Sequence, residues 1–174
     1  MEYKLLTTKE QEKYYDQIFE MMIAGDKDFI PPLSARSSTT QKDLTSSQGS
    51  IDGLKSYFEE MKKQRFMVCL DGEILVSFVS FKENFTNDKI FKEDLPNIYL
   101  STLIMRPEYR GQKVTQTLYE NLFNIYKDSG IFTRTWSTNA AHIRILSKFD
   151  FETIATVKND RGEGIDTIYF AKRR

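Results

Sequence analysis

One segment near the middle of the chain constrains the fold more than any other. Residues 98–105 form an apolar run with the composition of a β-strand, and residues 114–126 carry the periodic apolar pattern of an amphipathic helix. The short connection between them contains Arg110 and Gly111. Unpaired backbone N–H groups and the positive end of the helix dipole point into such a turn. The segment therefore predicts an anion-binding corner, and a diphosphate is its natural occupant.

The composition suits one compact domain over residues 1–174, since the chain is 40% hydrophobic. It has 25 basic and 25 acidic residues, and this formal charge of zero argues against a nucleic-acid-binding surface. Cys69 is the single cysteine and lies in an apolar run, which predicts a buried thiol. With His142 as the single histidine, these two residue types are too few for a zinc site, and we expect no metal.

The ends and apolar runs of the chain predict a cytoplasmic protein with no membrane partner. The N-terminal residues lack the apolar region of a signal peptide. No apolar run reaches the roughly 18 residues that a membrane-spanning helix needs.

Hydrophobic periodicity and turn residues predict the remaining elements. Strands are expected at residues 3–7, 65–70, 74–81, 98–105, 131–137, 151–157 and 165–171. Helices are expected at residues 8–24, 53–64, 112–128 and 139–149. Thr8 is the expected N-cap of the first helix, and Ser50 or Asp52 caps the second.

A long loop is expected between the first two helices. Residues 26–50 contain Pro31 and Pro32, which forbid a helix through them, and then a stretch rich in Ser, Thr and Gln. Loops of this length inside compact domains often line or cover a pocket. The alternative is a mobile surface connection.

The turn and helix start resemble the acetyl-CoA-binding motif of the GNAT superfamily of N-acetyltransferases. In that motif a hydrophobic strand precedes Pro, an aromatic residue and Arg/Gln-x-x-Gly-x-Gly/Ala. The chain reads Pro107, Tyr109, Arg110, Gly111, Gln112, Lys113, Val114, Thr115. Lys113 replaces the central glycine and Thr115 the final small residue. Gly111 can supply part of the lost backbone freedom, and Lys113 could contact a phosphate directly.

A second motif of the superfamily is similar to residues 139–151. Its Asn, small residue, Lys and Phe are matched by Asn139, Ala140, Lys148 and Phe151, at the expected distance from Arg110. Two positions differ from the family. The superfamily's common general acid is a Tyr at the position of residue 146, which here is Leu, and the usual Gly before Phe is residue 150, here Asp.

The resemblance spans nearly the whole chain and implies the GNAT fold. This is an α/β (α+β) architecture with a mixed central sheet of about seven strands, flanked by helices on both faces. Two parallel strands, here 98–105 and 131–137, part in this fold and admit the cofactor between them.

The resemblance also implies the residues that would bind acetyl-CoA. The backbone of Leu103, Ile104 and Met105 would meet the pantetheine arm and the acetyl carbonyl. Asn139 would hydrogen-bond the pantetheine, and Leu146 would face the cofactor at the position of the missing Tyr. The diphosphate would be held by the turn and helix start: Arg110, Gly111, Gln112, Lys113, Val114, Thr115 and Gln116.

His142 is the first candidate for proton exchange near the thioester. It lies three residues after Asn139 and four before Leu146, so we expect these three side chains to share the helix face toward the cofactor. It could act as acid or base at neutral pH, or it could pack at the helix start with no chemical role. Ser147 is a weaker alternative donor.

The acceptor pocket is less well defined by the sequence. Phe29, Arg36 and Tyr99 are candidate substrate-binding residues, and Arg36 could bind a carboxylate of the acceptor. The acidic residues of segment 83–94, with Asp26 and Asp28, could attract a cationic amine, or they could belong to solvated loops.

We therefore expect an acetyl-CoA-dependent N-acetyltransferase. It would transfer the acetyl group to a primary amine of a small molecule or peptide by direct attack in a ternary complex. The alternative is a catalytically weak acyl-CoA-binding sensor or interaction module, favoured by the missing Tyr. A third reading is that Lys113 and Thr115 close the turn and the cleft holds an unrelated ligand. The resemblance also allows a homodimer.

Overall fold

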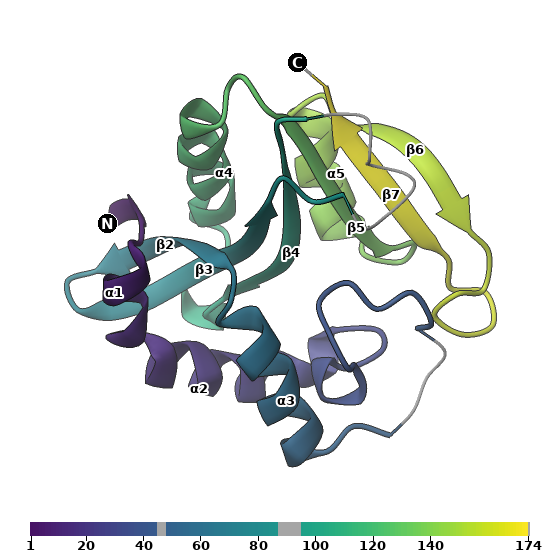
Figure 1. Ribbon diagram of the computed structural model, residues 1–174, viewed down its shortest axis with the longest axis horizontal. Coiled ribbons are helices and arrows are strands. Elements are labelled where there is room, and N and C mark those ends of the chain that lie inside the picture. The colour runs from purple at the N-terminus through teal and green to yellow at the C-terminus, as the bar shows by residue number, and fades with distance from the viewer. Residues whose placement is uncertain (45–47, 87–94, 174) are drawn as a thin grey trace.

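A computed structural model of the protein describes residues 1–44, 48–86 and 95–173. Its centre is a mixed seven-stranded sheet in the order β1-β2-β3-β4-β5-β7-β6, which confirms the expected fold class (Figure 1). The only parallel pair among the described strands joins β4 to β5. The strands are β1 (Glu2–Leu5), β2 (Arg65–Asp71), β3 (Ile74–Glu83), β4 (Asn97–Met105), β5 (Gly130–Trp136), β6 (Glu152–Val157) and β7 (Thr167–Lys172).

Helices cover both faces of this sheet. The α-helices are α1 (Thr8–Glu12), α2 (Tyr15–Gly25), α3 (Ile51–Met61), α4 (Val114–Ile125) and α5 (Ala140–Lys148). Short 3₁₀ helices follow α2, at η1 (Asp26–Asp28) and η2 (Leu33–Ala35), and β4, at η3 (Pro107–Tyr109). None of the described helices is long and apolar enough to cross a membrane.

Successive side chains of β2 point to opposite faces of the sheet. Phe66 and Val68 pack with α2 and α3, whereas Met67 and Cys69 pack with α4. Strand residues that are apolar on both faces are typical of a sheet covered on both sides. Cys69 is fully buried in the second cluster, as its apolar surroundings predicted.

The first helix differs from its prediction in two ways. It is divided into α1 and α2, and its N-cap is Thr7 rather than Thr8. Thr7 Oγ1 accepts a hydrogen bond from Glu10 N at 3.4 Å, and the Glu10 carboxylate accepts from Thr7 N at 2.9 Å. This reciprocal capping box depends on a Glu three residues after the cap, and Thr7 is the threonine with that spacing. Glu10 also pairs with Lys4.

The cap of α3 was expected to be either Ser50 or Asp52. Ser50 caps α3, because its hydroxyl accepts from Gly53 N at 3.0 Å, and Asp52 lies within the helix.

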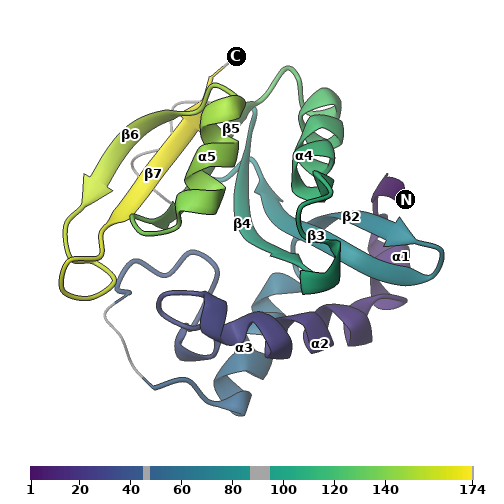
Figure 2. The ribbon, with the colours of Figure 1, turned by 180° about the vertical axis from the view of Figure 1, so that it is seen from behind.

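The feature that positions the site is the parting of β4 from β5. The two strands pair only from Asn97 with Gly130 to Leu100 with Thr133. Beyond that point, residues 101–105 follow β3, and β5 continues beside β7 (Figure 2). The sheet therefore opens into a wedge between its two central strands, as the resemblance implied.

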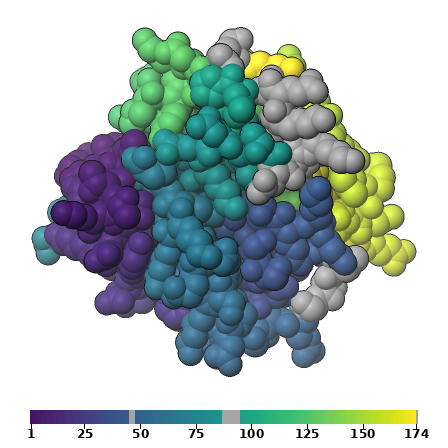
Figure 3. Space-filling view, in the orientation of Figure 1, coloured from purple at the N-terminus to yellow at the C-terminus, as the bar shows by residue number. Residues whose placement is uncertain are grey.

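The long loop after α2 lies against the C-terminal part of the sheet. Arg161, in the connection from β6 to β7, donates from Nη1 to Ile30 O at 2.6 Å, and Arg134 of β5 donates from Nη2 to Gln41 O at 2.5 Å. The space-filling view shows the loop beside the C-terminal strands (Figure 3). These contacts hold the loop across the open side of the wedge.

The capping box gives a direct test of the helix start. We expect Thr7→Ala to lower the free energy of unfolding by about 1 kcal/mol, since it removes the side-chain acceptor of the first turn. Thr8→Ala is the matched control and should change it by less than about 0.5 kcal/mol. Chemical denaturation of both variants measures the difference. Equal effects would contradict the assignment of Thr7 as the cap.

Candidate functional site

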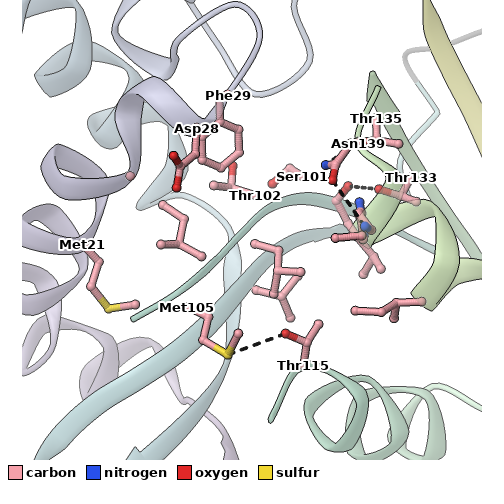
Figure 4. A pocket seen from close by; sticks show the side chains of 18 of the residues that line it. Met21, Asp28, Phe29, Ser101, Thr102, Met105, Thr115, Thr133, Thr135 and Asn139 are labelled. Carbon is pink, nitrogen blue, oxygen red and sulfur yellow. Dashed lines mark hydrogen bonds between the residues drawn. The ribbon is translucent and has the colours of Figure 1, made fainter. Parts of the chain in front are cut away.

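A cavity of about 520 Å³ opens where β4 and β5 part (Figure 4). Residues 100–105 of β4 form one wall and residues 133–136 of β5 form the other. Residues of α2 and the loop after it close one side, and residues of α4 and α5 close the opposite side. Figure 4 shows Met105 near Thr115, and Phe29 and Thr135 away from them.

The β4 wall can pair with an extended ligand. In an antiparallel pair, alternate residues direct their backbone N–H and C=O groups away from the partner strand. Because residues 101–105 pair with β3 but not with β5, some of their backbone groups face the opening. Leu103, Ile104 and Met105, whose backbone was expected to meet the pantetheine arm, all line the cavity.

The start of α4 offers free backbone donors at the same end. Its N-cap Lys113 makes no capping hydrogen bond through its side chain. The N–H groups of Val114, Thr115 and Gln116 donate to no residue within the described parts of the chain. Three free donors at the positive end of a helix dipole form an anion-binding position.

The replaced glycines of the two motifs keep a glycine-like backbone. Lys113 and Asp150 both have φ of 61°, in the left-handed region, and Gly111 has φ of 79°. The Thr115 hydroxyl contacts Met105 Sδ at 3.9 Å, drawn as a dashed line in Figure 4. Lys113 and Thr115, which replace small residues of the first motif, therefore leave the start of α4 open.

The expected diphosphate residues divide into two groups. Arg110 and Thr115 line the cavity, and Arg110 pairs with Asp28 at 3.2 Å on the surface. The others lie beside the cavity and could contribute through backbone groups: Gly111, Gln112, Lys113, Val114 and Gln116. Val114 is only 1% exposed because its side chain belongs to the core.

Asn139 and His142 line the cavity, but Leu146 and Ser147 do not. Leu146 is 0% exposed in the core cluster that includes α4, and Ser147 is exposed and donates to Ile143 O at 3.0 Å. The expected helix face is therefore wrong at its end. Ile145 takes the place beside His142 on the cavity wall, since α5 turns its next residue into the core.

The Asn139 side chain makes two hydrogen bonds within the protein. It is the N-cap of α5, where its Oδ1 accepts from His142 N at 3.3 Å. Its Nδ2 donates to Thr135 Oγ1 at 3.0 Å. Asn139 thereby ties α5 to β5 at the cavity wall.

Tyr119 of α4 is a site residue that the sequence did not single out. Its hydroxyl lies 2.9 Å from His142 Nε2, and both residues line the cavity. The available signal was its spacing, four residues after Thr115 on one helix face. Its apolar neighbours on α4 instead indicated a core residue, and its ring is indeed fully buried.

Burial determines the charge of this pair. Desolvation lowers the pKa of His142 to about 4 and raises the pKa of Tyr119 above its ordinary value. Both groups are therefore neutral at pH 7. This removes the imidazolium that an acid at neutral pH requires, so the predicted acid role of His142 is not supported. Its Nδ1 donates to no residue that the structure describes, and it remains a potential neutral hydrogen-bond donor.

The acceptor candidates are only partly gathered at the cavity. Phe29 and Arg36 line it, whereas Tyr99 lies in the part of β4 that is paired on both sides. The Tyr99 ring stacks on Phe85 with centroids 4.8 Å apart and is 2% exposed. The cavity instead includes Arg134 and Arg161, which the sequence did not single out.

The acidic candidates are also dispersed. Asp28 lines the cavity beside Arg110, but the Asp26 carboxylate accepts from Ser34 N at 2.8 Å and from Ser34 Oγ at 2.6 Å. Glu83 accepts from Tyr126 and pairs with Arg65 away from the cavity. Asp88, Glu93 and Asp94 lie outside the described residues.

No cluster of three or more His, Cys, Asp or Glu side chains suited to a metal ion occurs within the described residues. The donors at the cavity are backbone groups, hydroxyls, an imidazole and guanidiniums.

Comparisons with known proteins agree with this geometry. The model of the acetyltransferase (GNAT) family matches residues 34–151. A ribosomal-protein-alanine N-acetyltransferase from Brucella melitensis has a similar structure, with a TM-score of 0.67 and 13% identity over 100% of both chains. The protein yncA from Salmonella typhimurium, solved with its cofactor acetyl-CoA, gives 0.66 at 13% identity, over 99% of this chain and 93% of that one.

A third similar structure is an aminoglycoside 6'-N-acetyltransferase complexed with coenzyme A. Its TM-score is 0.67 at 12% identity, over 99% of this chain and 96% of that one. No curated protein matches by sequence. The structural likenesses at these identities establish the fold.

The lowered pKa of the half-buried His142 predicts a specific pH dependence of stability. Its folded pKa of about 4 lies below the value of about 6.5 in an unfolded chain, so between these values the unfolded chain binds a proton that the folded protein does not. The contribution of His142 to the free energy of unfolding is therefore fully present above about pH 6.5 and is lost as the pH falls toward 4.

We expect the free energy of unfolding to fall by about 2 kcal/mol more in the native protein than in His142→Gln between roughly pH 7 and pH 4.5. Denaturant titrations at several pH values measure both slopes. Parallel profiles for the two proteins would show that His142 is not buried as a neutral group.

Proposed function

Because the chain belongs to the GNAT acetyltransferase family, we propose that it transfers the acetyl group of acetyl-CoA to a primary amine. The acceptor is a small molecule or a peptide, and the amine attacks directly in a ternary complex. Residues 1–174 act as one acetyltransferase domain in this proposal. The observation that carries it is the opening between β4 and β5, with the uncapped start of α4 beside it.

Acetyl-CoA fits this opening in chemical terms. The amide groups of pantetheine can pair with the free backbone edge of residues 101–105, as a strand would. The diphosphate then meets the N–H groups of Val114, Thr115 and Gln116. The likeness to yncA, solved with acetyl-CoA, and to the aminoglycoside acetyltransferase, solved with coenzyme A, supports acetyl-CoA as the ligand here.

The chemistry needs few side chains. The lone pair of the neutral amine attacks the thioester carbonyl carbon, the carbonyl oxygen becomes an oxyanion, and collapse of this intermediate breaks the C–S bond. The amine proton is released to solvent and the thiolate leaves as CoA. Backbone N–H groups of β4 can stabilise the oxyanion, and holding the two reactants together supplies much of the rate.

His142 has a role in this scheme that does not require it to be charged. With Tyr119 O–H donating to Nε2, the imidazole carries its proton on Nδ1. This Nδ1–H can donate to the negative charge that develops on the carbonyl oxygen or the sulfur. Tyr119 then acts as a positioning residue that fixes the tautomer and the ring.

The alternative function is an acyl-CoA-binding module with little catalysis. The observation that favours it is that Leu146 occupies the position of the family's Tyr. Its buried apolar side chain has no acidic group to protonate the leaving thiolate. The release of free CoA thiol distinguishes the two functions. A transferase releases free CoA thiol when an amine is supplied, and a binding module does not.

Calorimetric titration with acetyl-CoA, CoA and ATP tests the cofactor, and an amine screen for thiol release tests the reaction. The proposal expects micromolar binding of both CoA forms and weaker binding of ATP. Binding without thiol release from any amine would favour the alternative, and no binding would overturn both.

Lys113 provides a test of the diphosphate position. We expect Lys113→Glu to weaken CoA binding about tenfold or more, because it places a negative charge at the phosphate position. Lys113→Gly keeps the left-handed backbone and should weaken it less. Lys127→Glu, an exposed residue just beyond the other end of α4, is the matched control and should bind CoA normally. Calorimetry compares the three, and unchanged affinity of Lys113→Glu would exclude this position for the diphosphate.

The donor role of His142 predicts a split between binding and turnover. We expect His142→Ala to lower kcat about tenfold with unchanged acetyl-CoA affinity, and Tyr119→Phe to lower kcat by a smaller factor. Tyr126→Phe removes a hydroxyl near the C-terminal end of the same helix and should not affect kcat. Steady-state kinetics and calorimetry separate the effects. Normal kcat in His142→Ala would assign His142 a purely structural role.

A further inference from the structure

Three arginines from distant segments meet at one part of the cavity wall. Arg36 comes from the loop after η2, Arg134 from β5, and Arg161 from the connection between β6 and β7. Arg36 is 9% exposed and Arg161 is 3% exposed, and Arg134 is partly buried. We call this set the arginine cluster.

None of the three forms an ion pair with a carboxylate within the described residues. Arg36 donates to Pro31 O at 3.0 and 2.7 Å. Arg134 reaches the Tyr169 hydroxyl at 3.4 Å as well as Gln41 O. Arg161 donates to Ile30 O and, at 2.9 Å, to Thr167 Oγ1. All of these acceptors are neutral.

Some donors of the cluster remain unused. Arg134 Nε and Arg161 Nη2 donate to no residue in the described part of the chain. Each guanidinium carries its donors in a rigid fork, so the bonds to the loop hold the plane and leave other donors facing elsewhere. An oxyanion can accept from such donors in pairs.

Three like charges at one wall repel one another, and the charge of Asp160, which accepts from the Thr167 hydroxyl beside Arg161, offsets only part of this repulsion. Burial, followed by the neighbouring Arg36 and Arg134, lowers the pKa of Arg161 to about 9. Burial also lowers the pKa of Arg36, whereas the pKa of Arg134 is raised, because its burial is outweighed by the neighbouring Tyr99 and Tyr169. Anchoring the loop could be done by neutral donors, so it does not require this charge. A bound anion would offset the repulsion and the lost hydration together.

Aromatic rings fix the positions of the guanidiniums. Arg36 lies over the Phe29 ring at 5.6 Å and Arg161 over the Trp136 ring at 5.7 Å. Phe29 and Trp136 contact each other with centroids 5.8 Å apart. They give this part of the cavity apolar surface next to positive charge, as a small molecule with a charged end and an apolar body requires.

We infer that the acceptor is a small primary amine that also carries an anionic group, a carboxylate or a phosphate, which the arginine cluster holds. This inference rests on the proposed transfer to an amine and adds its substrate class. The start of α4 lies at another part of the same cavity, since Figure 4 shows Thr115 away from Phe29. An anion fixed by the cluster would therefore orient the amine toward the thioester and leave the diphosphate position free.

Matched acceptors test the inference on the native protein. Amino acids are compared with their methyl esters, and O-phosphoethanolamine with ethanolamine, in the thiol-release assay. We expect the charged member of at least one pair to have a kcat/KM about a hundredfold higher, mostly through KM. A preference in the first pair identifies a carboxylate and in the second a phosphate. Equal values within both pairs, with an uncharged amine acetylated well, would overturn the inference while the proposed function stands.

Variants link that preference to the cluster. Arg161→Gln and Arg134→Gln should raise KM for the charged acceptor about tenfold or more and should reduce the preference for the charged over the uncharged member of the pair, while acetyl-CoA affinity is retained. This ratio separates loss of the anion contact from an effect on the loop that both arginines hold, because a disturbed loop would affect both acceptors alike. Arg144→Gln, an exposed residue on α5, is the control. Loss of acetyl-CoA affinity in a folded Arg161→Gln would instead assign the cluster to the cofactor and overturn the inference.

Anion binding can also be measured without turnover. Trp136 is the single Trp and lies beside Arg161, so its fluorescence reports on the cluster. We expect an N-acetyl amino acid or inorganic phosphate to change the emission with saturation in the native protein and not in Arg161→Gln. No saturable change with any anion, in a protein that binds acetyl-CoA, would contradict the inference independently of catalysis.

Discussion

The limited pairing of β4 with β5 is the constraint on which the site depends. Four residue pairs join these strands, and beyond Leu100 each strand remains bonded only to its other neighbour. Backbone groups in a sheet must be paired or solvated, so a wedge at this point creates an edge that a ligand can complete. Packing on both faces keeps the wedge from closing, because α2 lies on one side of the sheet and α4 and α5 lie on the other.

Two different kinds of positive potential meet in this cavity. At the start of α4 the potential comes from backbone N–H groups and the helix dipole, and it needs no particular side chain. At the arginine cluster it comes from three guanidiniums held by neutral oxygens and aromatic rings. The first suits the diphosphate of a cofactor shared by a family, and the second suits an anion particular to one acceptor. This division explains how a chain with zero formal charge can present a strongly basic pocket.

The sequence predicted the fold well because the fold depends on local patterns. The strand, the turn with Arg110 and Gly111, and the α4 helix are contiguous, and the structure retains a left-handed backbone at Lys113 and Asp150 despite the loss of glycine. The threonine cap was misplaced by one residue because both Thr7 and Thr8 precede the helix, and only the distance to Glu10 separates them. The loop after α2 does line the cavity, as one of the two alternatives held.

The rest of the site depends on packing that no local pattern records. Leu146 is turned into the core by the way α5 meets α4, so residue counting along α5 failed at that position. Tyr119 becomes a partner of His142 only when two helices meet. The arginine cluster joins Arg36 to Arg134 and Arg161, which lie much later in the chain, and its charge is apparent only after burial is known.

A crystal structure of the protein with acetyl-CoA would test the central claim most directly. The account predicts the pantetheine arm between β4 and β5, paired with residues 101–105, and the diphosphate on the N–H groups at the start of α4. The acetyl group would point along the cavity toward the arginine cluster. A cofactor bound outside this opening, or a diphosphate held by the arginines instead of the helix start, would contradict it.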